Sequence, residues 1–159
     1  MKEIKYALRG VTIDQFATVF EPASDNVEIN ISIPIKTNYG GRALAVGANI
    51  QFTEAGRPFM VAEAFCHYEI EEACWNDLSD GGKTSVALPK QFMDALARIA
   101  IGTLRGAICV KTENTPFAKY CLPIIEIGAS QECENGIGSE LANPRSMFGT
   151  VLGNWLLTD

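Results

Sequence analysis

The strictest constraint on the fold of this chain is a segment in which apolar residues occupy every second position. The apolar residues of this segment are Val27, Ile29, Ile31, Ile33 and Ile35. A period of two is typical of a β-strand with one buried face and one face in water. Pro34 cannot donate a hydrogen bond to a ladder, so we expect this end of the strand to lie at its terminus or at a sheet edge.

Three further segments alternate in the same way and predict neighbouring strands. In the first of them the alternation changes phase at Arg9-Gly10, which predicts a β-bulge in one long, bent strand. Short connections rich in Gly, Pro, Asn and Asp separate the segments, so the four strands favour an antiparallel meander or Greek key. The three segments are residues 5–20, 44–52 and 59–70.

A long amphipathic helix is predicted after the strands. Pro89 suits the first turn of a helix, and apolar residues recur at spacings of three and four as far as Leu104. Gly106, directly after Arg105, predicts the end of this helix. Beyond it, residues 107–112 and 120–127 are apolar and β-branched, which predicts short strands or extended segments.

The last part of the chain predicts a linker and a second helix. Residues 128–144 are rich in Gly, Ser, Asn and Glu, which predicts a mobile linker, and residues 147–157 carry apolar side chains at helical spacing. A length of 159 residues suits one domain. We therefore expect a single α+β domain over residues 1–159: a four-stranded antiparallel sheet with a long amphipathic helix and a C-terminal helix packed on one side.

Composition and charge narrow the class of protein. Thirteen Lys and Arg against 19 Asp and Glu give a net charge of -6, which argues against nucleic acid and anionic membrane surfaces as partners. No stretch approaches the roughly 18 apolar residues of a membrane helix, and the N-terminus lacks the apolar core of a secretory signal. The five cysteines are odd in number and contain no Cys-x-x-Cys pair, which favours reduced thiols and a cytoplasmic location.

The one histidine, His67, is the first candidate for catalysis or metal binding. The strand pattern places Glu63 and Glu69 on its face and Cys66 on the opposite face, which excludes a Cys/His dyad within this strand. A partner such as Cys109 would have to come from elsewhere, so a structural or surface role is the simpler interpretation. The spacing of the cysteines does not match a zinc site either.

Two other patterns resemble ligand sites without meeting their requirements. Residues 81–84 read Gly-Gly-Lys-Thr, as a phosphate loop ends, but Asp77 stands where its first glycine belongs and no helix follows directly. The acidic residues Asp77, Asp80 and 69–72 do not have the spacing of a calcium loop. The sequence therefore predicts no catalytic, cofactor-binding or metal-binding residue, no cofactor, and a protein that is not an enzyme.

A series of short motifs follows the predicted sheet in a recognisable order. The motifs are Pro-x-x-Phe-x-x-x-Leu-Ala-x-Ile-Ala from Pro89 to Ala100, Thr103-Leu104-Arg105-Gly106, Thr115-Pro116-Phe117 and Leu122-Pro123-Ile124. In this order, and over roughly residues 5–127, the chain resembles the SecB export chaperones and their SecB-like relatives.

The resemblance implies a protomer that forms dimers or tetramers and binds unfolded polypeptides in apolar grooves without ATP. Two departures put the export role and docking to the SecA motor in doubt. Only residues 21–26 join the first two strands, where the family has an aromatic crossover loop, and the predicted linker 128–144 is long for the family. The alternative is a non-catalytic structural or adaptor protein with one specific partner.

Client-contacting residues are not carried over from the family. The aromatic candidates for an exposed groove are Tyr39, Phe117, Tyr120, Phe148 and Trp155, each of which is more often found in a core or an interface.

Overall fold

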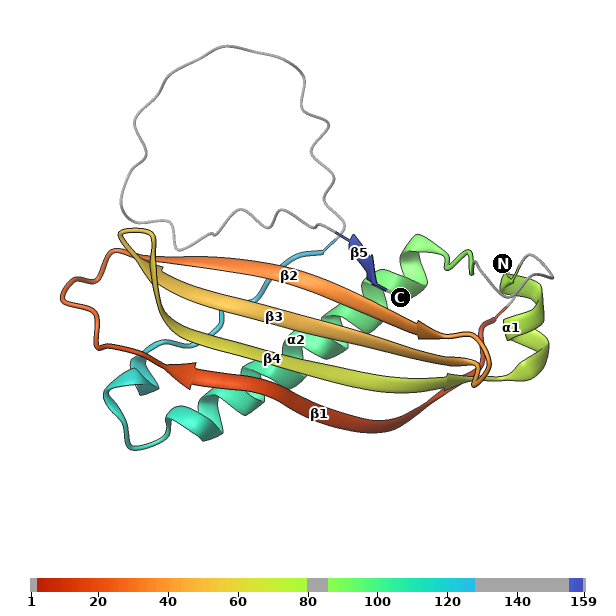
Figure 1. Ribbon diagram of the computed structural model, residues 1–159, viewed down its shortest axis with the longest axis horizontal. Helices are drawn as coiled ribbons and strands as arrows, with labels where there is room; N and C mark the ends of the chain where they lie inside the picture. Colours follow the sequence, from red (N-terminus) through yellow and green to blue (C-terminus); the bar gives the residue numbers. More distant parts are fainter. Residues whose placement is uncertain (1–2, 80–85, 128–154, 159) are drawn as a thin grey trace, which may run out of the picture.

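The computed structural model describes residues 3–79, 86–127 and 155–158 (Figure 1). Four long strands come first, followed by two helices, a short 3₁₀ helix and a short final strand. Their bounds are β1 (Tyr6–Thr18), β2 (Val27–Asn38), β3 (Ala43–Glu54), β4 (Arg57–Ile70), α1 (Glu72–Leu78), α2 (Lys90–Thr112), η1 (Pro116–Lys119) and β5 (Trp155–Thr158).

The sheet has the strand order β1-β4-β3-β2-β5. Strands β2, β3 and β4 are joined as consecutive antiparallel hairpins, and β1 lies antiparallel beside β4. The predicted four-stranded antiparallel sheet is confirmed, and of the two predicted topologies this order is that of a Greek key. β5 pairs in parallel with β2 at the opposite edge from β1.

One face of the sheet, called here the covered face, carries the core. Alternate residues of β3 point into it, and Val46, Ala48 and Ile50 are completely buried. Helix α2 lies diagonally across this face and packs chiefly on β3 and β4 (Figure 1). The buried side of α2 includes Leu96 and Leu104, as its helical spacing of apolar residues predicts.

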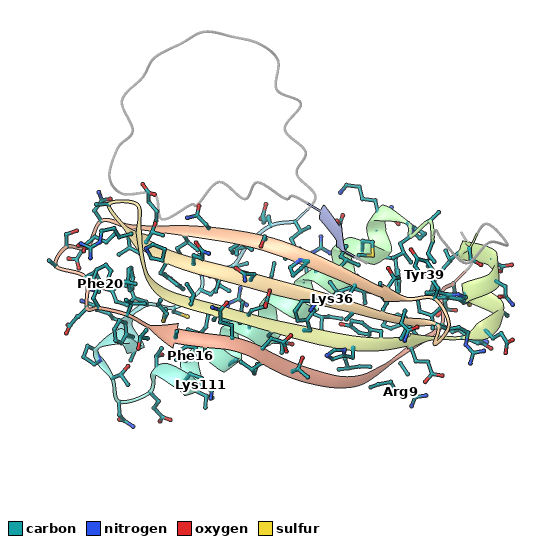
Figure 2. All side chains as sticks on the ribbon, viewed as in Figure 1. Arg9, Phe16, Phe20, Lys36, Tyr39 and Lys111 are labelled. Carbon is teal, nitrogen blue, oxygen red and sulfur yellow. The ribbon has the colours of Figure 1, made fainter. Side chains whose placement is uncertain are left out.

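The opposite face, called here the open face, has a smaller aromatic cluster. The ring of Phe65 lies over Gly47, and the Lys36 Nζ atom is 3.9 Å from the centre of that ring. Figure 2 shows Lys36 on this face, turned away from α2. Phe65 is only 1% exposed although none of the described helices lies over it, because Pro34 and Lys36 enclose the ring beside Gly47.

The predicted end of the long helix at Gly106 is wrong. Helix α2 continues to Thr112, so residues 107–112 are helical rather than a short strand. Ile108 is completely buried, and this contact with the core continues the apolar side of the helix past the glycine. The helix stops before Asn114, whose φ of 60° is left-handed. Residues 120–127 are extended without regular pairing.

The C-terminus and the end of β4 also differ from expectation. The predicted helix over residues 147–157 is wrong at its end, because residues 155–157 belong to strand β5 (Trp155–Thr158); residues 147–154 lie outside the described residues. Pairing with Ile33–Lys36 supplies hydrogen bonds to an edge of β2 that would otherwise lack them. The predicted linker 128–144 also lies outside the described residues, and α1, over residues 72–78, was not predicted.

Candidate functional site

The candidate functional site is the edge strand β1 of the sheet. It pairs with β4 along one side, and no strand pairs with its other side within the part of the chain that the structure describes. A strand of 13 residues with an unpaired side presents a long row of backbone N–H and C=O groups. Such an edge is suited to contact with another polypeptide.

Two bulges keep the apolar side chains of β1 on one face. The pairing with β4 shifts between Leu8 and Gly10 and again between Ile13 and Gln15, so the bulge predicted at Arg9-Gly10 is confirmed. We define the β1 strip as the apolar residues of β1 that lie opposite buried residues of β4 and therefore point to the covered face. These residues are Tyr6, Leu8, Val11, Ile13 and Phe16.

The β1 strip is apolar but largely uncovered. Leu8 is 51% exposed, Val11 44% and Ile13 41%, although the same face of β4 is fully buried. The cause is the position of α2, which packs on β3 and β4 and leaves the middle of β1 beside it. The strip thus places several large apolar side chains in water next to one another, as in a binding surface.

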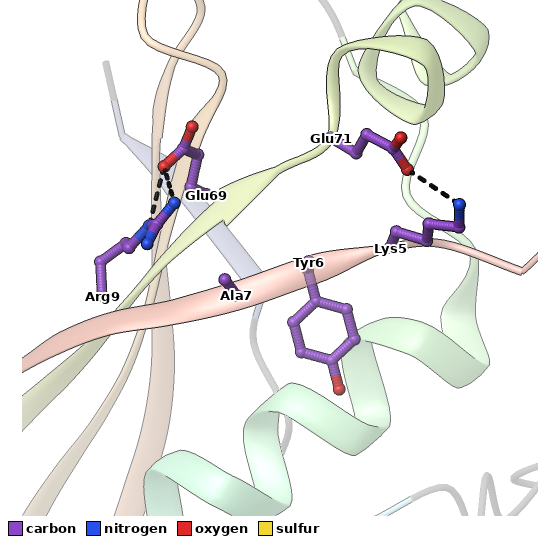
Figure 3. Close-up of a pocket in the computed structure, with 6 residues that line it drawn as sticks. All are labelled: Lys5, Tyr6, Ala7, Arg9, Glu69 and Glu71. Carbon is purple, nitrogen blue, oxygen red and sulfur yellow. Dashed lines mark hydrogen bonds and ion pairs between the residues drawn. The ribbon is translucent and has the colours of Figure 1, made fainter.

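One end of the β1 strip is anchored to α2. Tyr6 points from β1 toward the helix (Figure 3), and its ring centre lies 5.1 Å from that of Phe92 and 5.8 Å from that of Tyr68. Burial, followed by the neighbouring Cys66, raises the pKa of the Tyr68 hydroxyl, so this group remains protonated at neutral pH. The anchor fixes where the strip begins.

The other flank of α2 is covered by the chain itself. The Arg105 side chain donates hydrogen bonds of 2.8 Å to the carbonyl oxygens of both Leu122 and Pro123, and Arg98 donates one of 3.1 Å to that of Ile127. Leu122 is only 2% exposed. An extended apolar segment therefore covers one flank of α2, whereas the β1 strip lies open beside the other.

Charged residues surround the start of β1 on the open face of the sheet. The Lys5 Nζ atom is 3.6 Å from the Glu71 carboxylate, and Arg9 lies 2.7 Å from that of Glu69 (Figure 3). Together with Tyr6 and Ala7 these four residues line a shallow pocket. Each cation in the pocket is paired with a carboxylate, and such exposed pairs contribute little to stability.

In the structure His67, Glu63 and Glu69 each have a different hydrogen-bond partner. The His67 Nε2 atom is 3.0 Å from the hydroxyl of Thr12, while the Asn49 amide donates a 3.2 Å hydrogen bond to Glu63 and Arg9 one of 2.8 Å to Glu69. Cys66 points to the covered face, as predicted, and its thiol lies 3.6 Å from the Thr103 hydroxyl. His67 is therefore a hydrogen-bonded surface residue of the sheet.

The remaining predicted candidates fall elsewhere. Asp77 lies in α1, and residues 80–84 lie outside the described residues. Across residues 3–79, 86–127 and 155–158, no group of three or more His, Cys, Asp or Glu side chains is placed to hold a metal ion. Within the same described segments, no helix combines the length and apolar character needed to cross a membrane.

The aromatic candidates whose side chains the structure describes are partly buried and pack against the core. Tyr39 packs on Trp75, and Phe117 and Tyr120 both pack on Phe59, with Tyr120 at 4.9 Å between ring centres. The side chains of Phe148 and Trp155 are not described. The sequence did not single out the β1 strip, because alternation reports the face of a strand but not whether a helix covers it.

Comparison with known proteins supports the fold. No protein family and no curated protein matches the chain. Among solved structures it is similar to the SecB-like chaperone Rv1957 of Mycobacterium tuberculosis, in complex with a ChAD peptide from the Rv1956 HigA1 antitoxin. The TM-score is 0.52 at 12% identity, covering 76% of this chain and 90% of that one. A Streptococcus agalactiae protein of unknown function has a TM-score of 0.43 at 9% identity, covering 79% of this chain and all of that one. The predicted distant resemblance and SecB-like fold are confirmed.

Proposed function

We propose that this chain binds unfolded or partner polypeptides without ATP, as a SecB-like chaperone or dedicated chaperone, and that it is not an enzyme. The observation that carries the proposal is the uncovered β1 strip beside α2. The structurally similar Rv1957 is a SecB-like chaperone in complex with a peptide, which supports a polypeptide as the ligand.

The chemistry of the β1 strip suits a polypeptide with exposed apolar side chains. Leu8, Val11 and Ile13 each retain roughly half of their exposure, so covering them would contribute about 1 kcal/mol each. Part of that gain is offset by ordering the bound segment. Binding by one short segment is therefore weak, and it depends on apolar content rather than on a particular order of side chains.

We further propose a cytoplasmic homo-oligomer. In this assembly the backbone edge of β1 pairs with a second copy, while the side chains of the β1 strip remain on the covered face for the ligand. A dimer would place two strips side by side and lengthen the apolar surface available to one polypeptide.

The alternative function is an adaptor that uses the same fold for one partner. The feature that favours it is the short connection between β1 and β2, over residues 19–26, which contributes no large loop to a general groove. Breadth of binding separates the two functions, because a chaperone accepts many unfolded proteins and an adaptor accepts one.

The proposal is tested with the full chain and a chemically unfolded, slow-refolding protein. We expect co-elution with this client and suppression of its aggregation. The double variant Leu8→Gln/Ile13→Gln should bind about tenfold more weakly, because polar amides replace two of the five apolar side chains of the strip. Circular dichroism checks that the fold is kept.

The matched control is Val110→Gln, which removes an exposed apolar side chain from α2, where it is 73% exposed. This control should bind as the natural chain does. Equal binding by all three proteins would remove the β1 strip from the proposal, and no binding of several unrelated unfolded clients by the natural chain would favour the adaptor.

A further inference from the structure

Two cysteines come together where α2 and the following segment run side by side. Cys109 lies in the last turns of α2, and Cys121 lies at the start of the extended segment 120–127. Both are exposed and neither forms a disulfide. Their position is independent of the β1 strip and of the proposed function.

The hydrogen bonds of Arg105 and Arg98 set the alignment of the two segments. Arg105 holds the carbonyl of Leu122 and Arg98, two turns earlier in α2, holds that of Ile127, so the extended segment runs antiparallel to the helix. Cys109 lies one turn beyond Arg105 on the same side of α2. Cys121 directly precedes Leu122, so the alignment brings the two cysteines to the same level.

The electrostatics of Cys109 agree with a nearby Cys121 thiol. Partial desolvation and, next, a hydrogen bond with the Cys121 thiol raise the pKa of Cys109, which the nearby Arg105 guanidinium partly opposes. At neutral pH the Cys109 thiol is therefore protonated in most molecules. Its side chain is exposed, so an oxidant can reach it.

We propose that Cys109 and Cys121 are a redox-sensitive pair whose disulfide fastens segment 120–127 to α2. The oxidant is a small-molecule disulfide such as oxidised glutathione. One thiolate attacks it to form a mixed disulfide and releases one reduced thiol. The second thiolate then displaces the other. One S–S bond forms in the protein, the oxidant gains two electrons, and both cysteine protons go to solvent and the released thiols.

The consequence is a change in how firmly segment 120–127 covers the core. In the dithiol form the segment is held by three hydrogen bonds from arginines and by the burial of Leu122. In the disulfide form it also closes a short covalent loop, which restricts its detached states by on the order of 100-fold. Oxidation thus favours the closed segment, and reduction permits it to open.

The test uses the full chain with Cys133→Ser, because Cys133 lies outside the described residues and could compete for either thiol. The protein is equilibrated with oxidised glutathione or with dithiothreitol and acid-quenched, and its disulfides are mapped by mass spectrometry. We expect a Cys109–Cys121 linkage. Hydrogen exchange of residues 122–127 should be slower in the oxidised form by up to about 100-fold.

The matched control is Cys133→Ser/Cys121→Ser, which should show the faster exchange in both buffers. Glutathione adducts on Cys109 and Cys121 without an internal linkage would overturn the pairing. A mapped linkage with unchanged hydrogen exchange would overturn the fastening of the segment.

Discussion

On the open face of the sheet, Gly47 is the glycine whose surroundings leave no room for a side chain. A Cβ atom at this position would lie 2.7 Å from the Phe65 ring and 2.9 Å from the Pro34 ring. We expect Gly47→Ala to lower the free energy of unfolding by about 1–3 kcal/mol, because the Phe65 ring must move from a position that is 1% exposed. Urea unfolding followed by fluorescence measures this change.

The control for Gly47 is Gly10→Ala in β1, where the same methyl group meets nothing within 4 Å. This substitution should change the stability by less than about 1 kcal/mol. The double variant Gly47→Ala/Phe65→Leu should be less destabilised than the sum of its single variants, since the smaller side chain relieves the contact. If the losses in unfolding free energy are additive, the destabilisation by Gly47→Ala does not come from a clash with Phe65.

At the scale of secondary structure, Gly106 shows that a glycine alone does not end helix α2. Gly106 lies on the solvent side of the helix, and a Cβ atom there would meet nothing within 4 Å. We expect Gly106→Ala to raise the free energy of unfolding by about 0.5–1 kcal/mol, because alanine restricts the unfolded backbone and favours the helix. A decrease in the urea midpoint would show that something packs closely on this side of α2.

The sequence was most informative where the periodicity was long. The alternation of β2 and the phase change at Arg9-Gly10 predicted the sheet and its first bulge, because each strand face differs in polarity along its whole length. The end of α2 was misplaced, since the glycine signal at Gly106 is local and the burial of Ile108 is not. The helical spacing of apolar residues over 147–157 was misleading for the same reason. Residues 155–158 form a strand because they pair with the free edge of β2.

The candidate site was harder to predict than the fold. The apolar character of Leu8, Val11 and Ile13 is visible in the sequence, but their exposure depends on which strands α2 crosses. The alignment of Cys109 with Cys121 likewise depends on the hydrogen bonds that hold segment 120–127 along the helix. Both features arise from packing between elements far apart in the chain, which residue patterns do not report.

For the whole molecule, the pattern of β1 is symmetric about Thr12. On either side of this residue the covered-face positions follow the same order, with one bulge on each side. An antiparallel pair of β1 strands centred on Thr12 would set Val11 opposite the second copy's Ile13, and Leu8 opposite its Phe16. The same register brings Arg9 close to the second copy's Asp14, so opposite charges meet twice. A self-complementary edge of this kind is what a two-fold dimer requires.

We therefore expect a dimer, or a tetramer built from such dimers, when the mass in solution is measured by light scattering. Thr12→Cys should form a disulfide across the two-fold axis, because residues facing each other in an antiparallel pair have Cα atoms about 4.5–5.5 Å apart, within the range of a disulfide. Ala7→Cys is the control, since its expected neighbour is the second copy's Ala17 and not its own equivalent. A monomer at all concentrations, or equal cross-linking of the two variants, would contradict pairing through β1 and would leave the backbone edge of this strand open to a bound polypeptide.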